Sequence, residues 1–79
     1  MEIYLKYFGL IAECCQKSAE TKLIAPNTDL KSLVILLEEQ YSQLSNKSYK
    51  IAVNQKWVSM EKRLEAKDEV ALLPPFSGG

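Results

Sequence analysis

A single long amphipathic segment in the middle of the chain constrains the fold more than any other feature. Apolar side chains recur there at helical spacing, at Leu30, Leu33, Val34, Leu37 and Tyr41. This spacing predicts a helix with one apolar stripe, and Asp29 (or Thr28) is a suitable N-cap before it. Such a stripe has to be buried against a second layer of secondary structure. The remaining segments must therefore supply that layer.

Short segments on both sides of this helix alternate between apolar and polar residues, which is typical of strands. Five strands are expected, over residues 2–8, 19–25, 49–54, 56–59 and 69–73. A brief helix is expected over residues 10–16, and residues 42–48 are polar and turn-like. This order predicts an α+β domain over residues 1–73, in which a mixed sheet has the long helix across one face. It is the pattern of the ubiquitin-like β-grasp fold.

The size and composition fit one small globular domain. The chain has 79 residues, of which 47% are hydrophobic and 25% are charged, the balance of a folded protein with a single core. The two cysteines, Cys14 and Cys15, are adjacent, and neighbouring cysteines rarely bridge without strain. We expect both to be free thiols, as in a reducing cytosol, and to act as small buried hydrophobes.

Charge and hydropathy exclude several classes of protein. Ten basic and ten acidic residues give a formal net charge of zero, whereas nucleic-acid binders carry a basic excess. The first residues include no basic segment followed by a long apolar stretch, so no signal peptide is indicated. The longest apolar run, LVILL, is far shorter than a membrane span. We expect a soluble cytoplasmic protein that binds neither nucleic acid nor membrane.

The residue types needed for common catalytic sites are missing. There is no histidine, which removes the commonest general base and metal ligand, and two adjacent cysteines do not suffice for a zinc site. Gly9 is the only glycine before residue 78, so no phosphate-binding glycine loop can form. The adjacent acids Glu38–Glu39 and Asp68–Glu69 are expected on the solvated surface. We expect no bound metal or cofactor, and no enzyme activity from this chain on its own.

The segment PPFSGG, residues 74–79, carries the group with the most unusual chemistry, a terminal carboxylate. Pro74 and Pro75 end the last strand, because proline cannot donate to a sheet ladder. Gly78 and Gly79 have no Cβ and form a narrow tip that a confined site can enclose. Residues 74–79 reach about 20 Å when extended. We therefore predict a flexible tail that presents Gly79 to the active site of a partner.

Three sequence motifs point to one family. They are AVNQ at residues 52–55, DEVA at residues 68–71 and the ending Pro-Pro-x-Ser-Gly-Gly. Together they resemble the small, sulfur-carrying subunit of molybdopterin synthase, the MoaD family, and the length and the order of elements are similar to that family from end to end. A Gly-Gly ending alone is shared by ubiquitin-like proteins generally, whereas the whole string DEVALLPPFSGG is specific.

The resemblance implies a sulfur carrier for molybdenum cofactor biosynthesis. An adenylating enzyme related to ubiquitin-activating enzymes would use ATP and Mg²⁺ to adenylate Gly79, and a persulfide would convert the adenylate into a thiocarboxylate. The tail would then enter the large catalytic subunit of molybdopterin synthase and donate sulfur to cyclic pyranopterin monophosphate. In the family two small subunits sit at the ends of a large-subunit dimer, which implies a 2+2 heterotetramer.

Two positions depart from the family pattern. An arginine often precedes the glutamate that matches Glu13, and here the residue is Ala12; the turn before DEV usually contains glycine, and here it has Lys67. If that turn needs a positive φ, Lys67 costs about 1 kcal/mol.

Other functions stay open beside this one. They are a sulfur carrier for thiamine synthesis or tRNA thiolation, a ubiquitin-like modifier that Gly79 joins to lysines, and a plain interaction domain.

Strand parity predicts an apolar patch on the outer face of the sheet. The side chains that should face the long helix are Ile3, Leu5, Tyr7, Val70 and Leu72. Alternation then turns Phe8 and Leu73 outward, and Trp57 can join them. Three large apolar side chains beside a protruding tail suggest a partner site, with Trp57 as its anchor. We expect this patch to dock on the large subunit and on the adenylating enzyme, and Phe76 and Ser77 to continue into the partner.

Overall fold

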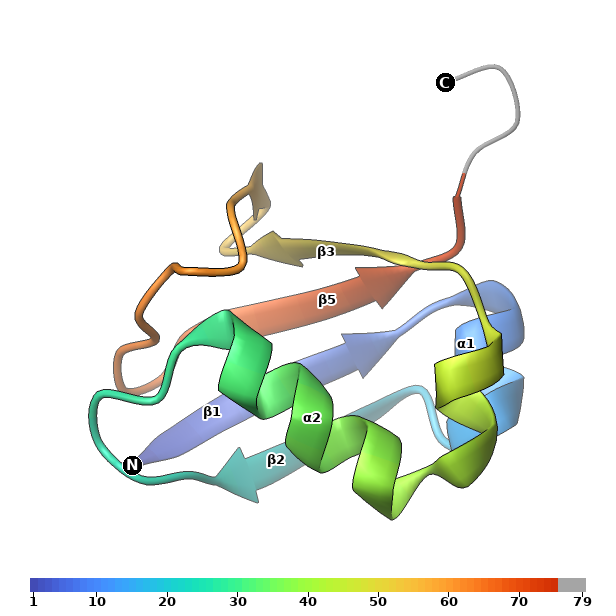
Figure 1. Ribbon diagram of the computed structural model, residues 1–79, viewed down its shortest axis with the longest axis horizontal. Helices are drawn as coiled ribbons and strands as arrows, with labels where there is room; N and C mark the ends of the chain where they lie inside the picture. Colours follow the sequence, from blue (N-terminus) through green and yellow to red (C-terminus); the bar gives the residue numbers. More distant parts are fainter. Residues whose placement is uncertain (76–79) are drawn as a thin grey trace.

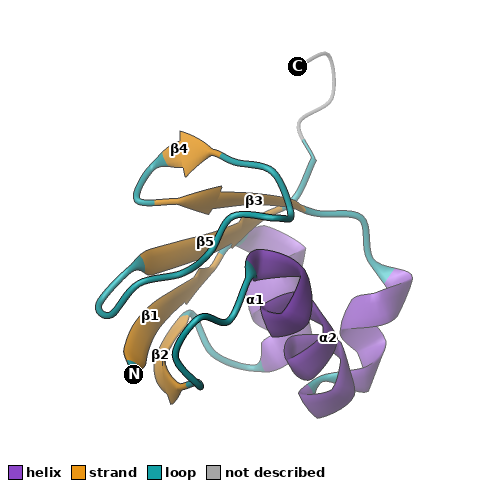
Figure 2. Ribbon diagram, turned by 60° about the vertical axis from the view of Figure 1, so that its left-hand side comes forward, coloured by secondary structure: helices purple, strands orange, loops and turns teal. Residues whose placement is uncertain are grey.

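The computed structural model describes residues 1–75, and within them a five-stranded sheet has two α-helices on one of its faces (Figures 1 and 2). The elements in chain order are β1 (Glu2–Tyr7), α1 (Gly9–Cys15), β2 (Ala19–Leu23), α2 (Leu30–Gln40), the 3₁₀ helix η1 (Ser42–Asn46), β3 (Lys50–Val53), β4 (Lys56–Trp57) and β5 (Glu69–Leu73). The predicted α+β fold, with a mixed sheet, one long helix and one short helix, is confirmed.

The sheet has the strand order β2-β1-β5-β3-β4. β1 and β5 run parallel at its centre, and the other neighbouring strands are antiparallel. The register places Leu5 beside Val70 and Tyr7 beside Leu72. As a result the first and last strands of the chain lie side by side, and both point toward the end of the sheet where α1 lies (Figure 1).

The core lies between the helices and one face of the sheet. Alternation along β1 buries Ile3, Leu5 and Tyr7, and the same parity in β5 buries Val70 and Leu72. From α2 the core receives the side chains of Leu30, Leu33 and Leu37, which are fully buried. The strand faces and most of the helix stripe therefore follow the sequence prediction, because periods of two and of 3.6 decide which side chains face inward.

The predicted N-cap of α2 is confirmed at Asp29. Its Oδ1 accepts a hydrogen bond of 2.8 Å from the backbone N–H of Ser32. This bond satisfies one of the unpaired donors of the first turn, and it lowers the pKa of the Asp29 carboxyl. The first turn of α2 is therefore fixed where the chain turns from the sheet to the helix layer.

Several element boundaries differ from the sequence expectations by one or two residues, and one segment differs in kind. Residues 42–48, expected to be a polar turn, contain η1, which places Leu44 fully in the core. Leu44 is a single apolar residue in a polar stretch, and one residue cannot show the helical periodicity that would predict its burial. The first strand ends at Tyr7 rather than Phe8, because Phe8 is already the N-cap of α1.

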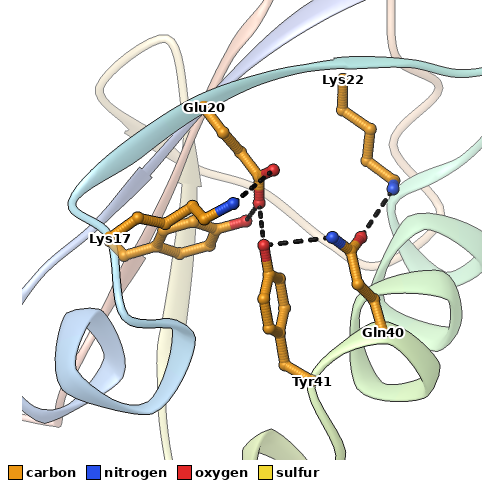
Figure 3. Close-up of polar contacts among 6 residues, drawn as sticks. Lys17, Glu20, Lys22, Gln40 and Tyr41 are labelled. Atoms are coloured by element: carbon orange, nitrogen blue, oxygen red, sulfur yellow. Dashed lines mark hydrogen bonds and ion pairs between the residues drawn. The ribbon is translucent and has the colours of Figure 1, made fainter.

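A polar cluster ties β1 and β2 to the end of α2 (Figure 3). Glu20 Oε2 accepts hydrogen bonds from Tyr7 OH at 2.5 Å and from Tyr41 OH at 2.6 Å. Lys17 Nζ lies 3.5 Å from the other carboxylate oxygen, and Gln40 Nε2 donates to Tyr41 OH. Burial raises the pKa of Glu20, but the tyrosine hydrogen bonds and Lys17 outweigh it, so the pKa is lowered overall. Glu20 is therefore ionised and fully bonded within this cluster.

Candidate site at the base of the C-terminal tail

The end of β5 is attached to the start of α1. Phe8 N donates a hydrogen bond of 3.2 Å to Leu72 O, which extends the β1–β5 ladder by one rung. Gly9 follows at φ +56, and a side chain there would bring its Cβ to 3.1 Å from Pro74 Cγ. A side chain at residue 9 would therefore meet both an unfavourable backbone angle and the proline ring. Glycine at this position lets Pro74 lie against the chain as β5 ends.

The open face of the sheet is hollowed next to this attachment point. A depression of about 340 Å³ is lined by Lys6, Phe8, Ala52, Gln55, Trp57, Glu69, Ala71 and Leu73. Phe8 and Trp57 keep 44% and 62% of their surface exposed, and Leu73 is half-buried. The three side chains come from the N-cap of α1 directly after β1, from β4 and from the end of β5. Their convergence beside Pro74 is the geometry that strand parity predicts; their role in partner binding stays a prediction.

Charged side chains border this depression without closing it. Lys6 Nζ and Glu69 Oε2 form an ion pair of 3.1 Å, and Lys50 Nζ lies 5.9 Å from the centre of the Trp57 ring. Both interactions are solvent-exposed, where such pairs contribute little stability. Their effect is to place one acidic and two basic groups around an apolar floor.

A polar contact that no sequence pattern predicted joins the β3–β4 turn to the start of β5. Asp68 was expected on the solvated surface, but it is only 7% exposed. Its Oδ1 accepts a hydrogen bond from Asn54 Nδ2 at 3.0 Å, and its Oδ2 accepts one from Glu65 N at 2.8 Å. Asn54 Oδ1 in turn accepts from Glu69 N at 3.0 Å. The AVNQ and DEVA motifs, quoted separately from the sequence, therefore meet in space.

The two cysteines lie away from this face, on α1. Cys15 is buried, as predicted, and Cys14 is half-buried. Burial, with smaller contributions from Cys14 and Glu20, raises the pKa of the Cys15 thiol to about 11. A thiol with this pKa is protonated at neutral pH and is a poor nucleophile.

The predicted tail lies only partly within the described residues 1–75. Pro74 is half-buried and Pro75 is exposed. Phe76, Ser77, Gly78 and Gly79 lie outside the described residues, so the proposed tail of residues 74–79 and the domain limit at residue 73 stay predictions.

Among residues 1–75 no three His, Cys, Asp or Glu side chains are grouped as a metal site would need. In the same range no helix has the length and apolarity to cross a bilayer.

A comparison with protein families decides the relationship. The sequence profile of the ThiS family matches residues 5–79. The chain belongs to the ThiS family. Because the match begins within β1 and continues to the last residue, the ThiS family relationship covers the sheet, both helices and the Gly-Gly ending.

Solved structures show the same fold. A putative molybdopterin converting factor subunit 1 from Pyrococcus furiosus has a TM-score of 0.91 at 19% identity, over 96% of this chain and 99% of that one. SAMP1 from Haloferax volcanii has a TM-score of 0.85 at 19% identity, over the full length of both chains. These two likenesses establish the fold.

A third structure is closer in sequence. It is a complex of subunits 1 and 2 of molybdopterin-converting factor from Helicobacter pylori, matched at 28% identity over both full chains with a TM-score of 0.71. With the ThiS family profile, these likenesses confirm the recognition made from the AVNQ, DEVA and PPFSGG motifs. The chain is a ubiquitin-like sulfur carrier of the MoaD/ThiS type.

Proposed function

We propose that this ThiS-family chain carries sulfur on Gly79 and donates it to cyclic pyranopterin monophosphate in molybdopterin biosynthesis. The observation that carries the proposal is the depression of Phe8, Trp57 and Leu73 beside the point where β5 ends. A carrier whose sulfur is on its chain end needs a docking surface next to that end. The apolar floor with polar borders is the anatomy of such an interface.

The chemistry belongs to the carboxylate of Gly79 and to partner enzymes. A carboxylate is a poor electrophile, so an adenylating enzyme first joins it to AMP, using ATP with Mg²⁺ and releasing pyrophosphate. A persulfide sulfur then attacks the acyl carbon and AMP leaves, and reductive cleavage of the resulting acyl disulfide by a second thiol gives the thiocarboxylate. This chain binds neither ATP nor a metal in the proposal. It supplies the reacting group and the surface that docks.

The second partner in the proposal is the large catalytic subunit of molybdopterin synthase. The Helicobacter pylori protein in the comparison comes from a complex of subunits 1 and 2 of molybdopterin-converting factor, which supports a large-subunit partner here. We propose that two copies of this chain bind a large-subunit dimer as a 2+2 heterotetramer, in the cytoplasm. The depression would pack on the large subunit while Phe76 to Gly79 enter its active site.

Intact-mass analysis of the protein purified from its own cells tests the carrier chemistry. A thiocarboxylate adds the mass of one oxygen-to-sulfur exchange, and treatment with a thiol-alkylating reagent should label the chain even when Cys14 and Cys15 are both replaced by alanine. Deletion of Gly79 should abolish the mass gain and molybdopterin production while the folded domain persists. Normal molybdopterin production by the deletion variant would refute the proposal.

The main alternative is a protein modifier, which the likeness to SAMP1 from Haloferax volcanii brings forward. Gly79 would then form an isopeptide bond with lysines of other proteins. Blots of cell extract separate the two functions, because a modifier gives a ladder of conjugates and a carrier gives the free chain. A carrier for thiamine synthesis or tRNA thiolation would show the same mass gain, but its deletion would leave molybdopterin production unchanged.

A further inference from the structure

We propose that Asn54 and Asp68 are positioning residues, which hold Trp57 in place for docking on the large subunit. We call their side chains, with the backbone amides of Glu65 and Glu69, the Asn54–Asp68 clamp. The inference rests on the proposed function, because docking gives the position of Trp57 its purpose.

The hairpin that carries Trp57 is too short to fix its own orientation. β4 has two residues, and its pairing consists of Ala52 with Trp57 and Val53 with Lys56. β4 is also an edge strand of the sheet, so it receives support from one side only. Isolated two-stranded hairpins are marginal in water even when they are longer. Some other contact must therefore set the angle of this hairpin against the sheet.

The turn of the hairpin is bonded to the start of β5. Asn54 and Gln55 have φ values of 52 and 67, the left-handed pair that a tight two-residue hairpin turn uses. Asn54 N donates to Glu69 O at 2.8 Å, and Glu69 N donates back to Asn54 Oδ1 at 3.0 Å. The asparagine side chain thus continues the β3–β5 ladder by one rung where the strand itself has ended.

Asp68, directly before β5, completes this arrangement. Its carboxylate accepts from Asn54 Nδ2 and from Glu65 N through different oxygens, so both ends of the group are bonded. Hydrogen bonds to a charged acceptor are stronger than neutral ones, and partial burial protects them from competition by water. The turn, and the tryptophan two residues beyond Gln55, therefore have a defined place before any partner binds.

A defined place for Trp57 matters because it is 62% exposed. A loose aromatic side chain has to be ordered during association, which weakens binding. The clamp removes this cost in advance, as preorganisation does in other interfaces. The clamp also gives a structural role to the AVNQ and DEVA motifs, which lie outside the tail.

The test uses Trp57 as a probe, since it is the only tryptophan of the chain. Asn54→Gly keeps the left-handed backbone but removes the side-chain bonds. Asn27→Gly is the matched control: Asn27 also has a positive φ of 67, and its side chain makes no hydrogen bond within residues 1–75. We expect Asn54→Gly to add a fast component to the fluorescence anisotropy decay of Trp57, and the control to leave it unchanged.

A rescue variant separates the clamp from a general loss of stability. In the double variant Asn54→Asp with Asp68→Asn the amide and the carboxylate exchange places, and all three side-chain hydrogen bonds can form again. We expect the single variant Asn54→Asp to loosen Trp57, because it sets two carboxylates against each other. The double variant should restore the slow anisotropy decay of the wild type.

Binding to the purified large subunit then connects the clamp to function. Asn54→Gly should raise Kd by about fivefold, the order of the cost of fixing one side chain, and the double variant should recover most of it. Equal anisotropy decay in wild type and Asn54→Gly overturns the inference, as does a folded double variant that keeps a loose Trp57. Failure of the wild-type chain to bind the large subunit instead overturns the proposed function, while the anisotropy alone decides the clamp.

Discussion

At the scale of single residues, five non-glycine residues of the described chain adopt a positive φ, and Lys67 is one of them. Its φ is 69, and its N–H donates to Glu2 O at 2.6 Å in the turn before β5. The turn before DEV therefore does need a positive φ. The glycine that is usual in the family would suit this backbone better than lysine.

Replacing Lys67 by glycine should stabilise the protein. Relief of the left-handed strain, about 1 kcal/mol, exceeds the entropy that glycine adds to the unfolded chain. A net gain of about 0.5 kcal/mol would raise Tm by about 2–4 °C, measured by thermal denaturation. Lys47→Gly is the control, because Lys47 has an ordinary φ of −108 and should lose stability. Equal losses in both variants would contradict the argument.

At the scale of elements, Glu20 joins β2 to β1 and to the end of α2 through its two tyrosine hydrogen bonds. Because its pKa is lowered from its ordinary value of 4.5 in the folded protein, its ionised form stabilises the fold. This contribution is complete above that ordinary value and is lost as the pH falls through the lower folded pKa.

Glu20→Gln should therefore lower the free energy of unfolding by about 1–2 kcal/mol at pH 7. The difference from wild type should shrink below pH 4.5, as wild-type Glu20 becomes protonated in its turn. Urea denaturation across this pH range measures it, with the exposed Glu39→Gln as control. A difference that stays constant down to the acid transition would mean that the charge of Glu20 does not stabilise the cluster.

The elements themselves were largely predictable, and the contacts that set the site were not. Ile3, Leu5 and Tyr7 were placed correctly because a period of two decides the face of a strand without any tertiary information. The Asn54–Asp68 bond joins residues 14 apart, and the ring of Pro74, directly after β5, occupies the space that a side chain at Gly9 in α1 would need. Such bonds depend on how turns are aimed in space, which no local pattern records.

At the scale of the whole molecule, a charge placed at one edge of the open sheet face should weaken partner binding, and a charge at the other edge should not. Trp57→Asp places a charge in the depression beside the base of the tail and should raise Kd for the large subunit by at least about tenfold. Leu23→Asp is a matched change, because Leu23 is 77% exposed and lies on β2, at the opposite edge of the sheet. Both variants should remain folded, as judged by circular dichroism, and equal binding by the two would contradict the docking assignment.

The central place of β5 has a consequence for quality control. β5, the last strand in the described sequence, lies between β1 and β3. A chain that stops before Glu69 therefore leaves two separate hairpins and no continuous sheet. Long-range pairing of this kind completes only when the whole sequence is available. A prematurely ended chain consequently cannot assemble the depression, because Glu69, Ala71 and Leu73 form part of it. Under the docking proposal, a partner that binds this face should therefore not bind a chain that ends before Glu69.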